Sequence, residues 1–286
     1  MIKEEVLLSI IENKNFQNNK KLLLEVIDKI LDEDTSNYKI DRLVFIKNKI
    51  IKDDEVVSKE IEIEIIYTYF LLNDLKMFEY FFNHLNTLYL KNMNKAYLYT
   101  IKDFEKNHWS IYDVVLDSVR LSAKLIENYE IDNDEIKHWV NIRKKNKELY
   151  LAFVISGIIV AHIGGIAINI SEYKLMKKGT LNEVDLKNGT YNINNIKYIY
   201  IPTIVIEKEF RKPQLLKKLL SSFFEILLKY KNLESIIINV YSLEGKKLSE
   251  RLGFKFVTSH NDGGKVYILD KSKIDDLKVF NKKLSR

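Results

Sequence analysis

The stretch of sequence that decides the fold is IVIEKEFRKPQLLKKLL, residues 204–220. Its first residues are apolar and β-branched, so a strand is expected over Lys197–Ile206, interrupted at Pro202 because proline cannot donate to a strand ladder. Pro213 stands where a helix can begin, since the first helical position needs no amide donor. Apolar residues at helical spacing then predict an amphipathic helix over Pro213–Tyr230.

A second strand and a second helix follow this stretch. Leu233–Val240 is rich in β-branched apolar residues and predicts a strand. Leu243–Arg251 predicts a short helix that ends near Gly253, a residue type that commonly terminates helices. Phe254–Ser259 and Lys265–Leu269 predict a hairpin around a glycine-containing turn. The C-terminal part therefore continues the alternation of strands and helices.

The longest apolar run, Leu151–Ile168, predicts two buried strands that turn at Ser156-Gly157. The run is short for a membrane-spanning helix and contains His162 and three glycines. We expect His162 to be a hydrogen-bonded structural histidine. We expect Gly164-Gly165 to mark a bulge or a close approach of backbone, because glycine inside a strand usually has such a role.

The first half of the chain contains neither glycine nor proline before Gly157. Apolar residues recur there three and four positions apart, which predicts helices. We therefore expect an all-helical N-terminal region over residues 1–92. Its expected helices are Ile2–Ile11, Lys20–Leu31, Tyr38–Ile51, Val56–Leu72 and Leu75–Leu90.

The second domain is expected over residues 93–286, where strands and helices alternate. Such alternation predicts an α/β (α+β) fold, a mixed sheet flanked by helices. The remaining expected elements are a strand at Lys95–Ile101, helices at Trp109–Tyr129 and Asp134–Lys144, strands at Glu148–Ile155 and Ile158–Ile170, and a polar insertion or long loop at Ser171–Asn195.

Composition excludes several classes of site. The chain has no cysteine, which excludes disulfides, thiolate metal sites and a cysteine nucleophile. It also lacks the His-Glu-x-x-His pattern, so we expect no metal. A net charge of +6 over 286 residues is small and gives no indication of nucleic-acid binding. The N-terminus does not have the pattern of a signal peptide. We therefore expect a cytoplasmic protein without a membrane contact.

Two stretches resemble the GNAT superfamily, the N-acyltransferases that use acyl-CoA. Asn239–Phe254 is similar to the strand, short helix and Leu-Gly-Phe of the family's second cofactor motif. The resemblance implies a GNAT-like fold for most of the second domain and transfer of an acetyl or longer acyl group to an amine. In Ile204–Leu220 the matching residues are Phe210, Arg211, Lys217, Lys218, Leu219 and Leu220.

The resemblance also implies where the donor, acetyl-CoA or another acyl-CoA, would bind. The strand residues Ile204, Val205 and Ile206 would present backbone groups to the pantetheine arm. Ser242 stands where an asparagine of the family commonly binds pantetheine. The pyrophosphate would lie at the helix start, because a helix N-terminus offers free amides and a positive dipole end. The residues of that turn are Arg211, Lys212, Gln214, Leu215 and Leu216.

Three residues are candidates for catalysis. Glu207 and Glu209 are expected at the end of the strand, on one face of it, where either could act as a base through water. Tyr200 could line a substrate pocket. Ser249 stands where the family often has a tyrosine that protonates the departing thiolate. The acceptor implied is an amine of a small molecule or of a protein.

The sequence departs from the family at the turn. The family pattern is Arg or Gln, two residues, Gly, one residue, then Gly or Ala, whereas Gln214 and Leu216 fill both small positions here. Pro213 also removes one amide donor. Two alternatives therefore stay open beside an N-acyltransferase. One is a catalytically inactive GNAT-fold interaction module, whose helical region docks a protein partner. The other is a transferase whose donor is an acyl carrier protein, drawn by the basic residues near the turn.

Overall fold

The computed structural model describes residues 7, 19–32, 38–52, 57–73, 96–124, 132–186, 195–274 and 276. The chain forms two compact units. The first unit comprises Met1–Asp117 and Phe153–Val160, and the second comprises Ser118–Ala152 and Ala161–Arg286. The expected helix at Leu75–Leu90 lies outside the described residues, as does the one at Ile2–Ile11 apart from Leu7.

The first unit contains three of the predicted helices, α2 (Lys20–Asp32), α3 (Ile40–Lys52) and α4 (Lys59–Asn73). Nine consecutive residues of α4, from Glu62 to Phe70, are buried. The buried carboxylate of Glu64 is compensated by Arg42, whose Nε and Nη2 donate to its two oxygens at 3.0 and 2.9 Å. A buried charge needs such a partner. The arrangement fixes α3 against α4.

Lys39 ties the start of α3 to other parts of the first unit. Its side chain is fully buried, and its ammonium donates to the carbonyl of Gly157 at 2.8 Å and lies 4.0 Å from the ring centroid of Trp109. Ser156 and Gly157 both have positive φ, 47° and 72°, as a tight hairpin turn requires. The predicted turn between two strands is therefore confirmed.

The sheet is mixed and has seven strands in the order β1-β2-β3-β4-β5-β7-β6. β4 and β5 run parallel, whereas β3–β4, β5–β7 and β6–β7 are antiparallel pairs. The predicted mixed sheet is confirmed. The strands are β1 (Tyr97–Thr100), β2 (Tyr150–Ile155), β3 (Ile158–Ile168), β4 (Tyr198–Ile206), β5 (Ser235–Val240), β6 (Lys255–Ser259) and β7 (Lys265–Asp270).

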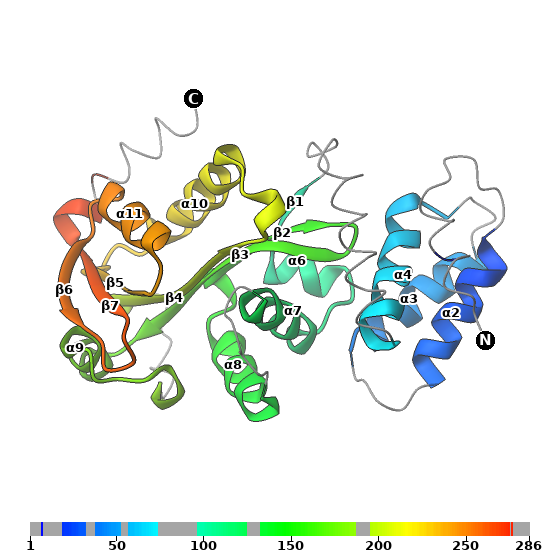
Figure 1. Ribbon diagram of the computed structural model, residues 1–286, viewed down its shortest axis with the longest axis horizontal. Coiled ribbons are helices and arrows are strands. Elements are labelled where there is room, and N and C mark those ends of the chain that lie inside the picture. The colour runs from blue at the N-terminus through cyan, green and yellow to red at the C-terminus, as the bar shows by residue number, and fades with distance from the viewer. Residues whose placement is uncertain are drawn as a thin grey trace. The chain divides into compact units, whose positions relative to one another are not determined.

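Helices cover both faces of the sheet in the second unit (Figure 1). α10 (Pro213–Leu227) and α11 (Leu243–Arg251) lie on one face, and α8 (Asn133–Lys145) and α9 (Ile170–Lys178) lie on the other. α10 buries one stripe of leucine and phenylalanine, as its spacing predicted. Two more helices are α6 (Ile101–Lys106), which directly follows β1, and α7 (Ile111–Ala123).

Ser171–Asn195, predicted as an insertion or a long loop, begins with a helix, α9, so the interpretation as a long irregular loop was wrong there. Asn169 caps this helix: its side chain accepts from the amide of Glu172, and the Glu172 carboxylate accepts from the amide of Asn169, both at 2.9 Å. This reciprocal capping box favours a helix even where apolar periodicity is weak. Gly179 ends the helix with a φ of 72°.

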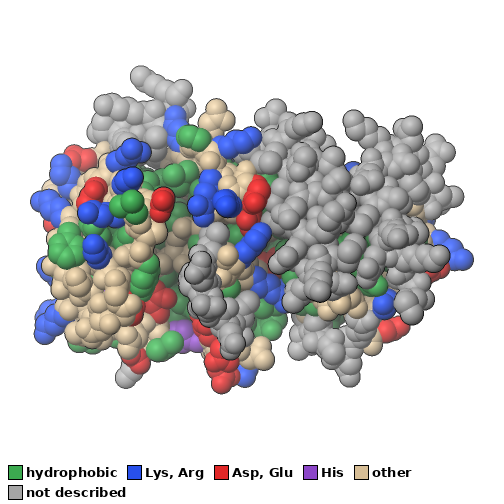
Figure 2. Space-filling view, in the orientation of Figure 1, with side chains coloured by type: hydrophobic (Ala, Val, Ile, Leu, Met, Phe, Trp, Pro, Cys, Tyr) green, Lys and Arg blue, Asp and Glu red, His purple; other side chains and the backbone are tan. Residues whose placement is uncertain are grey.

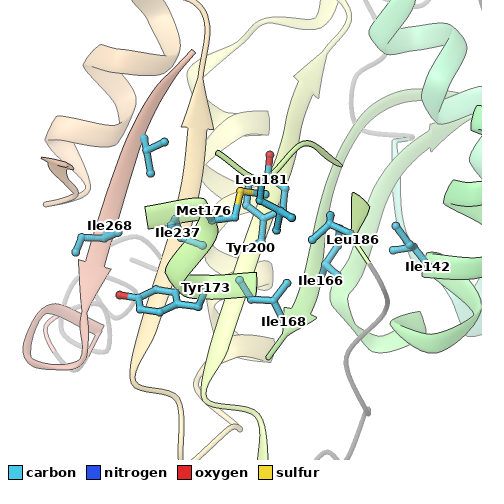
Figure 3. Packing of buried hydrophobic residues seen from close by; sticks show 11 residues of the cluster. Ile142, Ile166, Ile168, Tyr173, Met176, Leu181, Leu186, Tyr200, Ile237 and Ile268 are labelled. Atoms are coloured by element: carbon cyan, nitrogen blue, oxygen red, sulfur yellow. The ribbon is translucent and has the colours of Figure 1, made fainter. Parts of the chain in front are cut away.

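A hydrophobic cluster joins α9 to the sheet (Figure 3). The ring of Tyr173 stacks on Tyr198 with centroids 4.3 Å apart, and its hydroxyl donates to Ser235 at 3.2 Å. The insertion between β3 and β4 thus belongs to the core of the second unit. Buried members of the cluster are Ile142, Ile166, Ile168, Tyr173, Met176, Leu181, Leu186, Tyr200, Ile237, Val266 and Ile268.

Candidate functional site

The two parallel strands in the middle of the sheet separate part-way along their length. β4 and β5 pair from Tyr198–Ser235 to Ile201–Ile238. Both strands continue past this point, and these fully described strands form no further pairs with each other. Unpaired strand edges expose backbone N–H and C=O groups. We call the space between Pro202–Ile206 and Asn239–Val240 the β4–β5 slot.

A bulge in β4 coincides with this separation. Gly164 pairs with Thr203, but Ile166 pairs with Tyr200, so two steps along β3 match three along β4. Pro202 lies between Tyr200 and Thr203, in the part of β4 that contains the extra residue, and it has no amide hydrogen to donate. The bulge predicted at Gly164-Gly165 is therefore confirmed, with its extra residue on β4. It also changes the alternation, so that Thr203 faces the same side of the sheet as Tyr200.

Arg143, from the end of α8, lies under the bulge. Its Nη1 donates to the carbonyls of Asn146, Leu149 and Gly165 at 3.3, 3.0 and 3.3 Å. Burial lowers the pKa of this guanidinium to about 10. A Cβ on Gly164 would lie 2.5 Å from Arg143 Nη2, so a larger residue there would displace the guanidinium. Arg143 thereby links the end of α8 to the bulged strands.

His162 is a structural histidine, as expected. It is buried, and its Nε2 lies 3.2 Å from the carbonyl of Ser118. Burial, together with the charge of Arg143, lowers the pKa of His162 to about 3. The imidazole is therefore neutral over the physiological range and donates to that carbonyl.

The β4 side of the slot is more exposed than the paired part of the strand. Ile199, Tyr200 and Ile201 are buried, whereas every residue from Pro202 to Ile206 is partly exposed. Side chains therefore do not cover this half of β4 as they cover the paired half. Ile204, Val205 and Ile206 all lie in the slot, where the sequence placed the strand edge. The carbonyl of Ile206 accepts from Arg211 Nε at 3.2 Å, so this group is already bonded.

The turn between β4 and α10 differs from the slot, because its amides are already bonded. The amides of Arg211 and Lys212 donate to the carbonyls of Lys208 and Phe210 at 3.3 and 2.7 Å. The amides of Leu215 and Leu216 both donate to the carbonyl of Lys212, at 3.1 and 3.3 Å. Pro213 has no amide. The helix start therefore offers few free donors to a phosphate. Gln214, which is exposed, has the remaining amide of the turn.

Glu207 and Glu209 lie beyond the strand, not at its end as predicted, because the chain turns into a 3-10 helix at Lys208–Phe210. Glu207 is only 2% exposed, and its Oε1 accepts from Lys124 Nζ and from the amide of Lys208, both at 3.1 Å. Burial and a hydrogen bond with Glu209 raise the pKa of Glu207, against the effect of Lys124. Lys124 is a partner that the sequence did not indicate.

The two serines carried over from the resemblance both bond within α11. The hydroxyl of Ser242 accepts from the amide of Gly245 at 3.0 Å and caps the helix. The hydroxyl of Ser249 is buried and donates to the carbonyl of Gly245 at 2.7 Å. Each hydroxyl is thus bonded within α11.

A polar cluster that the sequence did not indicate lies where the slot begins. Tyr200, fully buried, donates its hydroxyl proton to the carboxylate of Glu183, in the 3-10 turn Glu183–Asp185 after α9. Past the last β4–β5 pair, Asn239 Nδ2 donates to the hydroxyl of Tyr241 at 2.7 Å, and that hydroxyl donates to Asp262 at 2.5 Å. We call Glu183, Tyr200, Asn239, Tyr241, His260 and Asp262 the Glu183 cluster.

His260 fixes the cluster to the insertion. Its Nδ1 lies 2.7 Å from Asp262 Oδ1, and its Nε2 lies 2.9 Å from the carbonyl of Leu181. The backbone amide of Asp262 also points at Nδ1, at 3.4 Å. The turn between β6 and β7 is thereby held against the segment that carries Glu183.

Glu183 is partly exposed, and its carboxyl group lies against the side chain of Tyr200. Burial raises its pKa to about 7, while the hydrogen bond from Tyr200 opposes the shift and the charges of Asp262 and Glu135 add to it. Burial and the neighbouring Glu183 raise the pKa of Tyr200 well above its ordinary value. The cluster therefore holds a carboxyl group that can exchange a proton near neutral pH.

The mixed sheet and the helix that follows β4 are those that the sequence predicted. A mixed seven-stranded sheet with helices on both faces is the architecture that the resemblance implies. No protein-family model matches the chain, and no curated protein matches it in sequence.

In the described part of the chain, no helix is long and apolar enough to cross a membrane. Nor do those residues group three His, Cys, Asp or Glu side chains suitably for a metal ion.

Several solved structures are similar to part of this chain. An N-acetyltransferase from Staphylococcus aureus Mu50 is 14% identical, with a TM-score of 0.41 over 61% of this chain and 98% of that one. The loading GNATL domain of CurA from Lyngbya majuscula is 14% identical, with a TM-score of 0.42 over 63% and 98%. The PaiA N-acetyltransferase from Thermoplasma acidophilum, in complex with coenzyme A, is 14% identical, with a TM-score of 0.35 over 61% and 98%.

Proposed function

We propose that this protein transfers an acyl group from a pantetheine thioester, with acetyl-CoA as the first donor to test, to an amine. The observation that carries the proposal is the β4–β5 slot, where two parallel strands diverge and β4 stays partly exposed. Unpaired backbone groups along both edges are suited to the amides of an extended pantetheine arm. The transferase part would be residues 93–286, and residues 1–92 would dock a partner.

The slot supplies two contributions to such a reaction. It holds the thioester in one orientation beside the acceptor, which replaces a bimolecular encounter by a local one. A strand amide aimed at the thioester carbonyl stabilises the negative charge that develops on that oxygen. Ile204, Val205 and Ile206 are the residues whose backbone we assign to these contacts.

The turn before α10 is expected to contribute less to donor binding. Most of its amides are bonded within the chain, so the pyrophosphate would depend on side-chain charge from Arg211, Lys212 and their neighbours. Long basic side chains bind phosphate as mobile charges and with little geometric preference. We therefore expect the pantetheine arm to dominate binding, which allows a carrier-protein donor as well as coenzyme A.

The test is donor binding followed by transfer. Acetyl-CoA and acetyl-pantetheine are titrated by calorimetry, and thiol release is then measured with primary amines. Saturable binding and amine-dependent thiol release support the proposal. Absence of binding for both thioesters at millimolar concentration contradicts it.

A second candidate, a non-catalytic interaction module, is favoured by one observation. The turn amides and the hydroxyls of Ser242 and Ser249 all have partners within the chain. A double variant, Gln214→Gly with Leu216→Gly, separates the two functions. If the variant binds acetyl-CoA and the natural chain binds no thioester, the natural chain has lost the donor.

A further inference from the structure

The Glu183 cluster lies beside the slot, on the face of the sheet that α8 and α9 cover. Figure 3 shows Tyr200 pointing from β4 toward the segment that carries Leu181. Figure 2 shows acidic side chains and a histidine at the lower left, in the part of the view where Figure 1 places α9 and α8. Tyr200 lies one residue before the last β4–β5 pair, and Asn239 lies one residue after it.

The other carboxylates near the slot are already committed. Glu207 accepts from an ammonium group and a backbone amide through one oxygen. Asp262 accepts from Tyr241, from the amide of Gly264 and from His260. Within the described residues, Glu183 has one partner for its carboxylate, the hydroxyl of Tyr200 on Oε1. Its second oxygen is the one available to a ligand.

A second observation points to a ligand with N–H donors. Asn239 is only 8% exposed, and its Oδ1 has no hydrogen-bond partner within the described part of the chain. Its Nδ2 donates to Tyr241, which fixes the orientation of the amide. Buried acceptors normally have a donor. An ammonium group beside Glu183 and Asp262 would supply N–H donors and match their charge.

We propose that the acceptor is a primary amine that binds as its ammonium form at the Glu183 cluster, and that Glu183 is the base that removes its proton. This inference rests on the proposed acyl transfer. The ammonium gives one proton to the Glu183 carboxylate, and the neutral nitrogen attacks the thioester carbonyl carbon. The C–N bond forms and the C–S bond breaks. The thiolate takes the second proton from that nitrogen, which leaves an amide and a free thiol, and Glu183 releases its proton to solvent.

The pH dependence follows from the groups that face Glu183. Its carboxyl group faces Tyr200 on β4, Tyr241 after β5, Glu135 on α8, and Asp262 and His260 in the β6–β7 turn. The backbone carbonyl of Glu183 faces His138 of α8. A base must be ionised, so kcat/KM should rise with pH through the pKa of Glu183, about 7. Tyr200 holds that pKa down, so its removal should shift the rise to higher pH.

The experiment measures kcat/KM against pH for wild type, Glu183→Gln, Tyr200→Phe and the control Asp185→Asn, with acetyl-CoA or acetyl-pantetheine and a primary amine. Asp185 lies in the same 3-10 turn and is exposed, so its variant should match wild type within twofold. Glu183→Gln should lose about 100-fold at pH 7, a usual contribution of a general base. The loss should shrink at high pH, where more of the amine is already neutral.

The outcomes separate this inference from the proposed function. No thiol release by wild type with any amine overturns the acyl transfer itself. An active wild type, with a folded Glu183→Gln variant of equal activity and an unchanged pH profile, overturns the role of Glu183 alone. If Glu183→Gln does not fold, Tyr200→Phe decides the question. If kcat/KM of Tyr200→Phe rises at a higher pH than that of wild type, the result supports Glu183 as the base. If the rise occurs at the same pH, the result overturns that role.

Discussion

The slot and the turn before α10 are adjacent parts of one candidate site, and they differ in what they retain. In the slot, β4 and β5 diverge after Ile201–Ile238, and β4 stays partly exposed. In the turn, four of the amides from Arg211 to Leu216 are bonded within the chain and Pro213 has none. The difference reflects how each part is built. A strand edge offers its backbone groups with almost any apolar side chain in the sequence. A phosphate-binding turn needs positions without a Cβ.

The largest effect is expected from removing the support under the bulge. Arg143→Met should leave the carbonyls of Asn146, Leu149 and Gly165 without their donor and lower the free energy of unfolding by about 3 kcal/mol. Urea unfolding measures this. The neighbouring exposed Lys144→Met should change it by less than about 0.5 kcal/mol. Equal stabilities for both variants would show that Arg143 does not hold the slot.

Filling the slot should be the next largest effect. Ile204→Trp adds a bulky side chain at a partly exposed slot position and should reduce thioester binding about 100-fold, equivalent to about 2.7 kcal/mol. The matched control is Ile170→Trp on α9, at a position that is 46% exposed. Calorimetry with acetyl-pantetheine measures both. Unchanged affinity in Ile204→Trp would place the donor elsewhere.

Restoring small residues in the turn should have a moderate effect. Gln214→Gly with Leu216→Gly should raise the affinity for acetyl-CoA about 10-fold and leave that for acetyl-pantetheine unchanged, because only the former has a pyrophosphate. Glycine in the first helical turn should also lower stability by about 1 kcal/mol per site. A gain for both donors alike would argue that the variant changes the slot and not the turn.

The smallest difference is expected between the two thioester donors, acetyl-CoA and acetyl-pantetheine. If the turn contributes little, acetyl-CoA and acetyl-pantetheine should have kcat/KM values within about threefold of each other, which corresponds to less than about 1 kcal/mol. Side-by-side initial rates with one amine measure this. A preference of 100-fold for acetyl-CoA would show that the turn binds the nucleotide end in spite of its bonded amides.

Much of the fold could be predicted from local signals. Apolar spacing and breakers predicted α10, α11, the β2–β3 turn and the strands around them, because these depend on residues close in sequence. The failure at α9 is instructive. Its capping box, Asn169 and Glu172, was present in the sequence, but only Tyr173 and Met176 provide a buried apolar face. Local capping therefore determined this helix where periodicity did not.

The candidate site was less predictable. Strand and turn positions such as Ile204 and Arg211 followed from the resemblance, because that motif is continuous in sequence. Glu183 gave no signal. It lies in a polar segment, 17 residues from Tyr200, and it meets the turn that carries Asp262 only after the insertion has folded back under the sheet.

The sequence alone determined the elements and their order, because capping, spacing and proline act over a few residues. Pro202 even indicated where β4 would be interrupted. Tertiary structure decided which backbone groups stay unpaired and which carboxyl group lies beside the slot. Both depend on long-range partners: the pairing of β4 with β3 and β5, and the burial of Glu183 beside Tyr200. Hydrogen-bond pairing and desolvation are set by distant residues, so no local pattern contains them.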